Sequence, residues 1–106
     1  MPLFGWGIMR IDGDSMVPTL NDGDYVVYRQ LSASQKAALN IGDIIAFRYA
    51  DPAHMVKRIT AIYDGWLNVA GDSPHSMGSQ AIGPVQLDDI IGIARLRIAP
   101  SGLSKL

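Results

Sequence analysis

Ser15 and Lys57 are the two residues of this chain whose types and surroundings together can perform nucleophilic chemistry. A serine hydroxyl is a weak nucleophile until a base removes its proton. A lysine amine can be that base only where it is neutral near the working pH, and this requires an apolar setting. The pair therefore indicates a serine peptidase whose general base is a lysine rather than a histidine.

Lys57 falls within a predicted strand from His54 to Ile62, a stretch rich in apolar and β-branched residues. Side chains alternate between the two faces of a strand, so Met55, Lys57 and Ile59 share one face and Arg58 points the other way. This pattern makes Lys57 the single charge on an apolar face. The alternative is an edge-strand lysine whose stem packs while its amine reaches water.

Ser15 follows the turn signal Asp12-Gly13-Asp14 and precedes the chain breaker Pro18. A serine at such a turn can present both its hydroxyl and its backbone N–H to a substrate. The alternative is a turn serine whose hydroxyl bonds to its own backbone. Each segment taken alone leaves both interpretations open.

Four segments, taken together and in order, resemble the conserved boxes of the signal peptidase I family. They are residues 13–24, 42–47, 56–59 and 71–85, and the resemblance covers most of the chain, from residue 11 to about residue 93. The short form and the Gly-Asp-x-Pro spacing are most similar to the small proteases that mature nickel superoxide dismutase. The self-cleaving LexA and UmuD domains also pair a serine nucleophile with a lysine base.

The resemblance implies a role for each matched residue. Ser15 matches the nucleophile, Lys57 the general base, and Ser76 a serine that orients the lysine amine. The backbone N–H of Ser15 would form part of the oxyanion hole, next to Gly13, where some signal peptidases carry a serine hydroxyl. The implied reaction is acyl transfer through an acyl-enzyme, with Lys57 moving the proton.

The last box departs from the family pattern. Gly78-Ser79-Gln80 stands where the family has Asp-Ser-Arg, so a carboxylate and a guanidinium that brace the loop near the lysine are missing. We expect a weaker scaffold around an intact Ser–Lys dyad.

The implied substrate is a protein or peptide with small residues before the cut, processed by removal of a leader or propeptide. No cofactor and no metal is expected. Two other functions stay open: a LexA- or UmuD-like regulatory domain that cleaves itself or dimerises, and an inactive peptide-binding module. No helix-turn-helix pattern is present, which favours a peptidase acting on a separate substrate.

Composition narrows the class of protein. The chain has 106 residues, 48% of them hydrophobic, which predicts a single Ser–Lys peptidase domain over residues 1–106 with an apolar arm at 1–9 and a flexible tail at 100–106. A net charge of -1 with no basic run argues against nucleic acid as a partner. The absence of cysteine excludes disulfides and thiol catalysis.

No stretch approaches the roughly 20 apolar residues of a membrane-spanning helix, and no signal peptide is evident. We therefore expect a cytoplasmic or membrane-peripheral location. Leu3, Phe4, Trp6 and Ile8 form either a first strand on the core or an edge that contacts a membrane surface.

The fold is predicted to be mainly β: a coiled, largely antiparallel sheet or small barrel of the signal peptidase or LexA type, with one short helix. Predicted strands cover residues 8–11, 25–29, 44–49, 54–62 and 90–98, and the helix runs from Ser32 or Ser34 to Leu39. Asp64-Gly65 predicts a tight hairpin.

Two weaker patterns were also considered as functional sites. His54, His75 and Asp72 match no metal-binding motif, and a histidine-based triad is the less favoured use of them. Asp88 and Asp89 would point to opposite faces of a strand, so they predict a solvated edge rather than a carboxylate pair.

Overall fold

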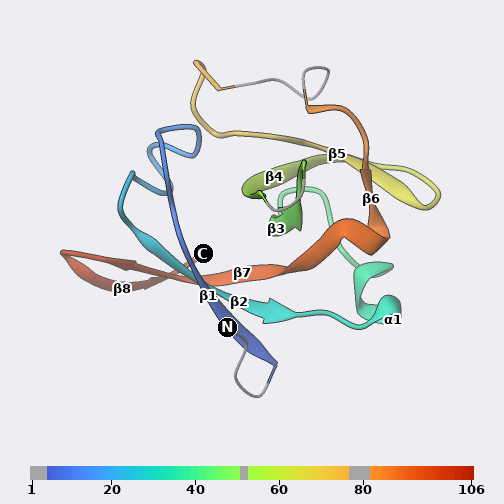
Figure 1. Cartoon of the computed structure of the whole chain (residues 1–106), viewed down its shortest axis with the longest axis horizontal. Coiled ribbons are helices and arrows are strands. Elements are labelled where there is room, and N and C mark those ends of the chain that lie inside the picture. The colour runs from blue at the N-terminus through green and yellow to red at the C-terminus, as the bar shows by residue number, and fades with distance from the viewer. Residues whose placement is uncertain (1–4, 51–52, 77–81) are drawn as a thin grey trace.

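The chain folds into one curled antiparallel β-sheet, shown by the computed structural model in Figure 1. The structure describes residues 5–50, 53–76 and 82–106. Within them, eight strands pair in the order β1-β2-β7-β3-β4-β5-β6, and β8 pairs with β7. The prediction of a mainly-β, antiparallel fold with one short helix is confirmed. The strands are β1 (Trp6–Arg10), β2 (Tyr25–Gln30), β3 (Ile44–Arg48), β4 (His54–Ile62), β5 (Trp66–Ala70), β6 (Val85–Gln86), β7 (Ile90–Ala99) and β8 (Gly102–Lys105).

The short helix α1 (Ala33–Lys36) begins at a capping box. The Ser32 side chain accepts a hydrogen bond from the Gln35 N–H, and the Gln35 side chain accepts one from the Ser32 N–H at 2.9 Å. The helix ends before the predicted Leu39, because the N–H groups of Ala38 and Leu39 turn back to carbonyls only three residues earlier. Such bonds tighten and end the last turn of a helix.

The C-terminal residues differ most from expectation. Residues 100–106 were expected to form a flexible tail, but Gly102–Lys105 form β8, which pairs with β7 from Ala99 opposite Gly102 to Leu96 opposite Lys105. Gly102 has a φ of 119°, a conformation that favours glycine at the turn. Four residues have little intrinsic preference for the strand conformation, so β8 forms because it pairs with β7.

Smaller differences occur elsewhere. The first strand spans Trp6–Arg10 rather than residues 8–11, because Ile11 leaves the ladder to bond with Gly23 and Asp24. Of the predicted N-terminal arm, residues 1–4 lie outside the described part of the chain. Asp88 and Asp89 lie in the 3-10 turn η1 (Leu87–Asp89) rather than in a strand. The Asp64-Gly65 hairpin is confirmed, with the Tyr63 N–H bonding the Trp66 carbonyl.

The strand β3 separates two clusters of buried side chains. Ile44 and Ala46 point into a first cluster with Met16, Leu20 and Val26, among others. Ile45 and Phe47 point into a second, which includes Ile59, Leu67, Val69, Val85 and Ile90. Since side chains alternate along a strand, a central strand buried on both faces serves both clusters. The neighbouring β4 contributes Val56 to the first cluster and Ile59 to the second.

No helix among the described residues has the length and apolar character to cross a bilayer.

Candidate active site

The loop that carries Ser15 is held by backbone hydrogen bonds between its two ends and by two buried side chains. The Ile11 N–H bonds the Asp24 carbonyl and the Gly23 N–H bonds the Ile11 carbonyl, each at 2.8 Å, so the loop closes on itself. Met16 and Leu20 are 1% and 0% exposed, and their side chains pack in the first core cluster. The sequence therefore holds Ser15 at the surface by burying the apolar residues that follow it.

Lys57 is a buried lysine, with only 3% of its surface exposed. It lies opposite Ile45 in the register of β3 and β4, at the last position before the described pairs of β4 with β5 begin at Arg58. Its burial contradicts the alternative of a lysine whose amine reaches water. Burial lowers the pKa of the Lys57 amine, because removal from water disfavours the charged form.

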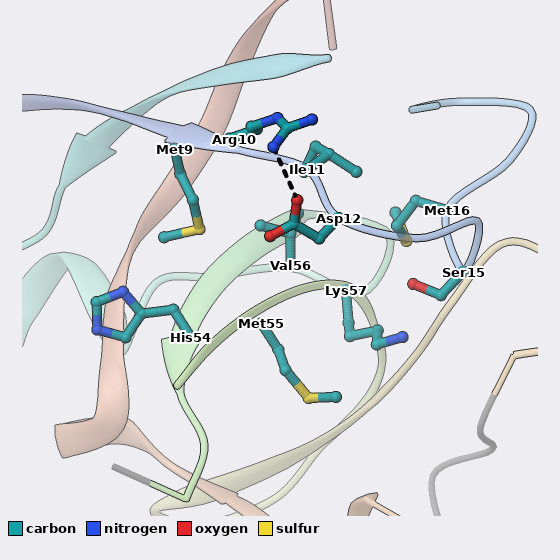
Figure 2. A pocket seen from close by; sticks show the side chains of 10 residues that line it. All are labelled: Met9, Arg10, Ile11, Asp12, Ser15, Met16, His54, Met55, Val56 and Lys57. Atoms are coloured by element: carbon teal, nitrogen blue, oxygen red, sulfur yellow. Dashed lines mark ion pairs between the residues drawn. The ribbon is translucent and has the colours of Figure 1, made fainter. Parts of the chain in front are cut away.

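Ser15 and Lys57 line one pocket of about 170 Å³. One wall is the end of β1 with the residues after it, Met9 to Asp12, and the other is the start of β4, His54 to Lys57. Figure 2 shows the Ser15 hydroxyl and the Lys57 amine turned toward one another at one end of this pocket. Segments more than forty residues apart in the sequence thus meet at one pocket.

A second loop, residues 71–76, packs directly on Ser15. The Ser73 N–H donates to the Ser15 carbonyl at 2.9 Å. At Gly71 a Cβ atom would come within 2.3 Å of that carbonyl oxygen and 2.6 Å of the Ser76 hydroxyl, so only glycine fits there. The close approach of backbone to backbone explains the glycine that precedes Asp72.

Ser76 borders a second pocket, which it shares with Asp14, Ser15, Ser73 and His75. Lys57 borders the first pocket and Ser76 the second, with Ser15 common to both. Ser15 therefore lies where two pockets adjoin.

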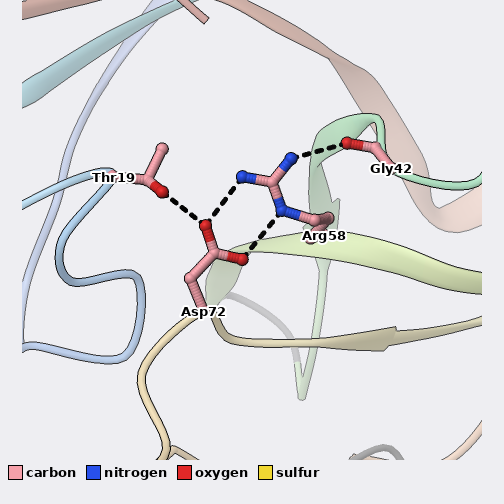
Figure 3. Close-up of polar contacts among 4 residues, drawn as sticks. All are labelled: Thr19, Gly42, Arg58 and Asp72. Atoms are coloured by element: carbon pink, nitrogen blue, oxygen red, sulfur yellow. Dashed lines mark hydrogen bonds and ion pairs between the residues drawn. The ribbon is translucent and has the colours of Figure 1, made fainter.

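A network of hydrogen bonds and one ion pair, not anticipated from the sequence, links the loop that carries Ser15 to the three later boxes (Figure 3). The Arg58 guanidinium donates two hydrogen bonds to the Asp72 carboxylate, at 2.8 and 2.7 Å, and one to the Gly42 carbonyl at 2.8 Å. The Thr19 hydroxyl donates to the same carboxylate. Bonding to Arg58 is the main cause that lowers the pKa of Asp72, and bonding to Asp72 raises that of Arg58.

The histidine-based alternative is not assembled. His75 borders the second pocket beside Ser15, and its backbone N–H donates to Ser73. Both carboxylate oxygens of Asp72, which would have to orient the imidazole, are bonded to Arg58 and Thr19. His54 is exposed, as expected, and lines the far part of the first pocket.

The backbone around Ser15 offers one donor to a developing oxyanion. The Gly13 N–H is already bonded to the Asp22 carboxylate at 2.7 Å, so Gly13 itself is engaged. The Ser15 N–H forms no hydrogen bond with the other described residues. Gly78, Ser79 and Gln80, the departure in the last box, lie outside the described residues.

A comparison with protein families supports this assignment of chemistry. The profile described as signal peptidase, peptidase S26, matches residues 2–64, more than half of the 106-residue chain. The chain belongs to this family. The matched range of the peptidase S26 family contains Ser15, Lys57 and Arg58, whereas Asp72 and Ser76 follow it. No curated protein matches the chain at a significant level.

Sequence reasoning named Ser15, Lys57 and Ser76 as candidate site residues but did not anticipate the network around Asp72. The available signals were the Asp72 carboxylate after an obligatory glycine and Arg58 pointing away from Lys57 on an interior strand. A charged pair at that spacing has no recognisable local motif, since its members come from different strands and loops.

Proposed function

We propose that the protein is a serine endopeptidase with a Ser–Lys dyad that removes a leader or propeptide from a protein substrate. The observation that carries the proposal is a lysine, 3% exposed and with its pKa lowered by burial, in one pocket with a serine. A buried lysine amine without a role is costly and rare in a small domain. Membership of the peptidase S26 family supports the same reaction class.

The reaction proceeds by acyl transfer. Neutral Lys57 takes the Ser15 hydroxyl proton as the oxygen attacks the peptide carbonyl, and the Ser15 N–H donates to the oxyanion. The C–N bond breaks as the protonated lysine returns its proton to the leaving amine. Water, deprotonated by the same lysine, then hydrolyses the acyl-enzyme and frees the Ser15 hydroxyl. The family resemblance assigns to Ser76, which borders the second pocket with Ser15, the role of orienting the lysine amine.

The walls of the first pocket suit an extended peptide. The β4 backbone over His54 to Lys57 pairs with β3 on one side, whereas its described pairs with β5 begin only at Arg58. A substrate strand can add to such an edge, with main-chain hydrogen bonds giving affinity and side-chain pockets giving selectivity. A pocket of about 170 Å³ is below the roughly 300–1,000 Å³ of small-molecule sites. It therefore favours small residues before the cut.

A peptide library digested with the protein and read by mass spectrometry tests the proposal. We expect cuts after small residues, lost in both Ser15→Ala and Lys57→Ala. His75→Ala is the discriminating variant, because a histidine base would make it inactive and a lysine base leaves it active. An active Lys57→Ala would refute the mechanism. The precursor of nickel superoxide dismutase is the first natural substrate to test, on the strength of the motif spacing.

The dependence of kcat/KM on pH is a second test of the same base. Only the neutral amine accepts the Ser15 proton, and burial lowers the pKa of Lys57. We therefore expect the rate to rise with pH through that lowered pKa and to level off above it. A flat profile from acid to alkaline pH would exclude a lysine base.

A further inference from the structure

The second pocket at Ser15 is large enough for one side chain of a substrate. Its volume is about 170 Å³, below the roughly 300–1,000 Å³ of small-molecule sites. Its lining residues are Asp14, Ser15, Ser73, His75 and Ser76. Because Ser15 also lines the first pocket, a peptide that reaches Ser15 along the first pocket can continue into the second.

Hydrogen bonds fix one wall of this pocket relative to the nucleophile. The Ser73 N–H donates to the Ser15 carbonyl at 2.9 Å, and the Ser76 N–H donates to the Ser73 carbonyl at 3.1 Å. The His75 N–H donates to the Ser73 hydroxyl at 3.2 Å. The turn at residues 73–76 is therefore bonded both internally and to the backbone of Ser15. A site that is ordered before its substrate arrives loses little entropy on binding, so it can be selective.

Asp14 brings to this pocket a carboxylate that has no partner among the described residues. Each other carboxylate in residues 11–24 and 71–76 has one, and the pairs are Asp12 with Arg10, Asp22 with the Gly13 N–H, Asp24 with Arg97, and Asp72 with Arg58. Asp14 is also exposed. The remaining lining residues are three serines and a histidine, so the pocket carries one negative charge when that histidine is neutral. A charge of one sign that the protein does not balance favours the opposite charge on the ligand.

We propose that the second pocket holds the side chain of the residue directly after the scissile bond, and that Asp14 selects a lysine or arginine there. The inference rests on the proposed function, in which the residues before the cut lie along the first pocket. A long basic side chain can lay its apolar stem in a pocket of this size while its charged end reaches a carboxylate. Exposed ion pairs contribute modestly, so we expect a preference of about two- to fivefold over a neutral residue.

The first pocket offers a substrate cation no such unbalanced charge. Its one carboxylate, that of Asp12, lies 3.6 Å from the Arg10 guanidinium, which lines the same pocket. The opposite charges of these two side chains offset each other. Selection by charge is therefore expected after the cut and not before it, where the size of the pocket selects.

Three peptides that differ only in the residue after the cut test the inference. They share one sequence with a small residue before the cut, and they carry lysine, glutamine or glutamate directly after it. We expect kcat/KM to fall in that order, with lysine about fivefold or more above glutamate at low salt. The ratio should shrink as salt rises, because exposed charges are screened. A second set, with the same three residues placed three positions before the cut, should show no such order.

The ratio of kcat/KM for the lysine peptide to that for the glutamate peptide identifies the responsible carboxylate. Asp14→Asn should bring this ratio close to one. Asp12→Asn, the same change two residues earlier on a carboxylate paired with Arg10, should leave the ratio near its wild-type value. His75→Lys places a cation in the pocket from the other loop, so it should lower the ratio even where Asp14→Asn does not fold. Because each ratio is measured on one protein, a general loss of rate cancels.

The outcomes separate this inference from the proposed function. Cuts after small residues at equal rates for all three peptides would overturn the inference alone. A ratio that neither Asp14→Asn nor His75→Lys changes would do the same, as would charge selection before the cut instead of after it. If no peptide is cut by the wild type, the proposed function fails and the inference fails with it.

Discussion

At the scale of the residue, burial of Lys57 lowers the pKa of its amine but also destabilises the fold. Its neighbours on the same side of β4, Met55 and Ile59, are apolar and belong to the second core cluster. No ion pair reaches the Lys57 amine from the carboxylates of the described residues. Its pKa is lowered by burial alone, so the folded state favours the neutral form. The property that would make Lys57 a base is the one that makes it costly to bury.

Lys57→Met should therefore raise stability while abolishing peptide cleavage. A lysine whose pKa is lowered on folding releases its proton at lower pH than in the unfolded chain, so its charged form destabilises the fold below the folded pKa. That cost fades as pH rises through the lowered pKa toward the unfolded value. We expect a gain of about 0.5–2 kcal/mol in the free energy of unfolding at neutral pH. Urea denaturation at neutral and alkaline pH measures it, and the gain should shrink at alkaline pH.

A gain of the same size at every pH would show that folding does not lower the pKa of Lys57. Arg58→Met is the matched control, because Arg58 is adjacent in β4 but bonded to Asp72. It should lose stability rather than gain it.

At the scale of the element, the site is built by clamping loops to strands. Arg58 shares β4 with Lys57, Asp72 lies in the loop that packs on Ser15, and Thr19 lies in the loop that carries Ser15. The three side chains therefore tie the nucleophile loop to the strand of the base. Bidentate pairing of a guanidinium with a carboxylate adds geometric specificity to its energy.

Asp72→Asn should loosen this clamp, since an amide cannot accept both Arg58 bonds. The pKa of Asp72 is lowered on folding, mainly by bonding to Arg58, so its contribution to stability is present above the unfolded pKa and fades as pH falls through the folded one. We expect a loss of about 1–3 kcal/mol at neutral pH, as for other buried bonds to charged groups. Cleavage should slow through kcat more than through KM, because the clamp positions Ser15 without touching the substrate.

Thr19→Val removes one bond of the same clamp and keeps the Arg58 pair. It should slow cleavage less than Asp72→Asn does. If both variants cleave at the wild-type rate, the network has only a stabilising role. Steady-state kinetics on one peptide substrate decides between these outcomes.

At the scale of the whole molecule, β3 and β4 each contribute side chains to both buried clusters. Ile44 and Ile45 are consecutive residues of β3, yet they belong to different clusters. On β4, Val56 belongs to the first cluster and Ile59 to the second. We therefore expect the two clusters to unfold together.

Leu20→Ala and Leu67→Ala test this coupling, with one substitution in each cluster. Both residues are fully buried, and each truncation should cost about 2–5 kcal/mol. We expect a single unfolding transition in each variant, shifted in the same direction, when far-UV circular dichroism and tryptophan fluorescence are followed in urea. Separate midpoints for the two probes in either variant would show that the clusters unfold independently.

The sequence by itself determined the elements with strong local signals. The alternation around Lys57 and the Asp64-Gly65 turn are short-range patterns, and each appears in the structure where the residues predicted it. Of the two serines that could begin the helix, Ser32 is its cap. The four ordered boxes also named Ser15 and Lys57 as a candidate pair, because they resemble a family whose members bring these segments together. These features are encoded within a few residues of chain.

Tertiary structure alone decided the features that depend on distant partners. The burial of Lys57 depends on β3 and on the residues around Ser15 that line the same pocket, and the Arg58–Asp72–Thr19 clamp joins segments up to 53 residues apart. β8 exists through its ladder to β7. Pairing across such separations is set by the whole sheet, so no local pattern records it.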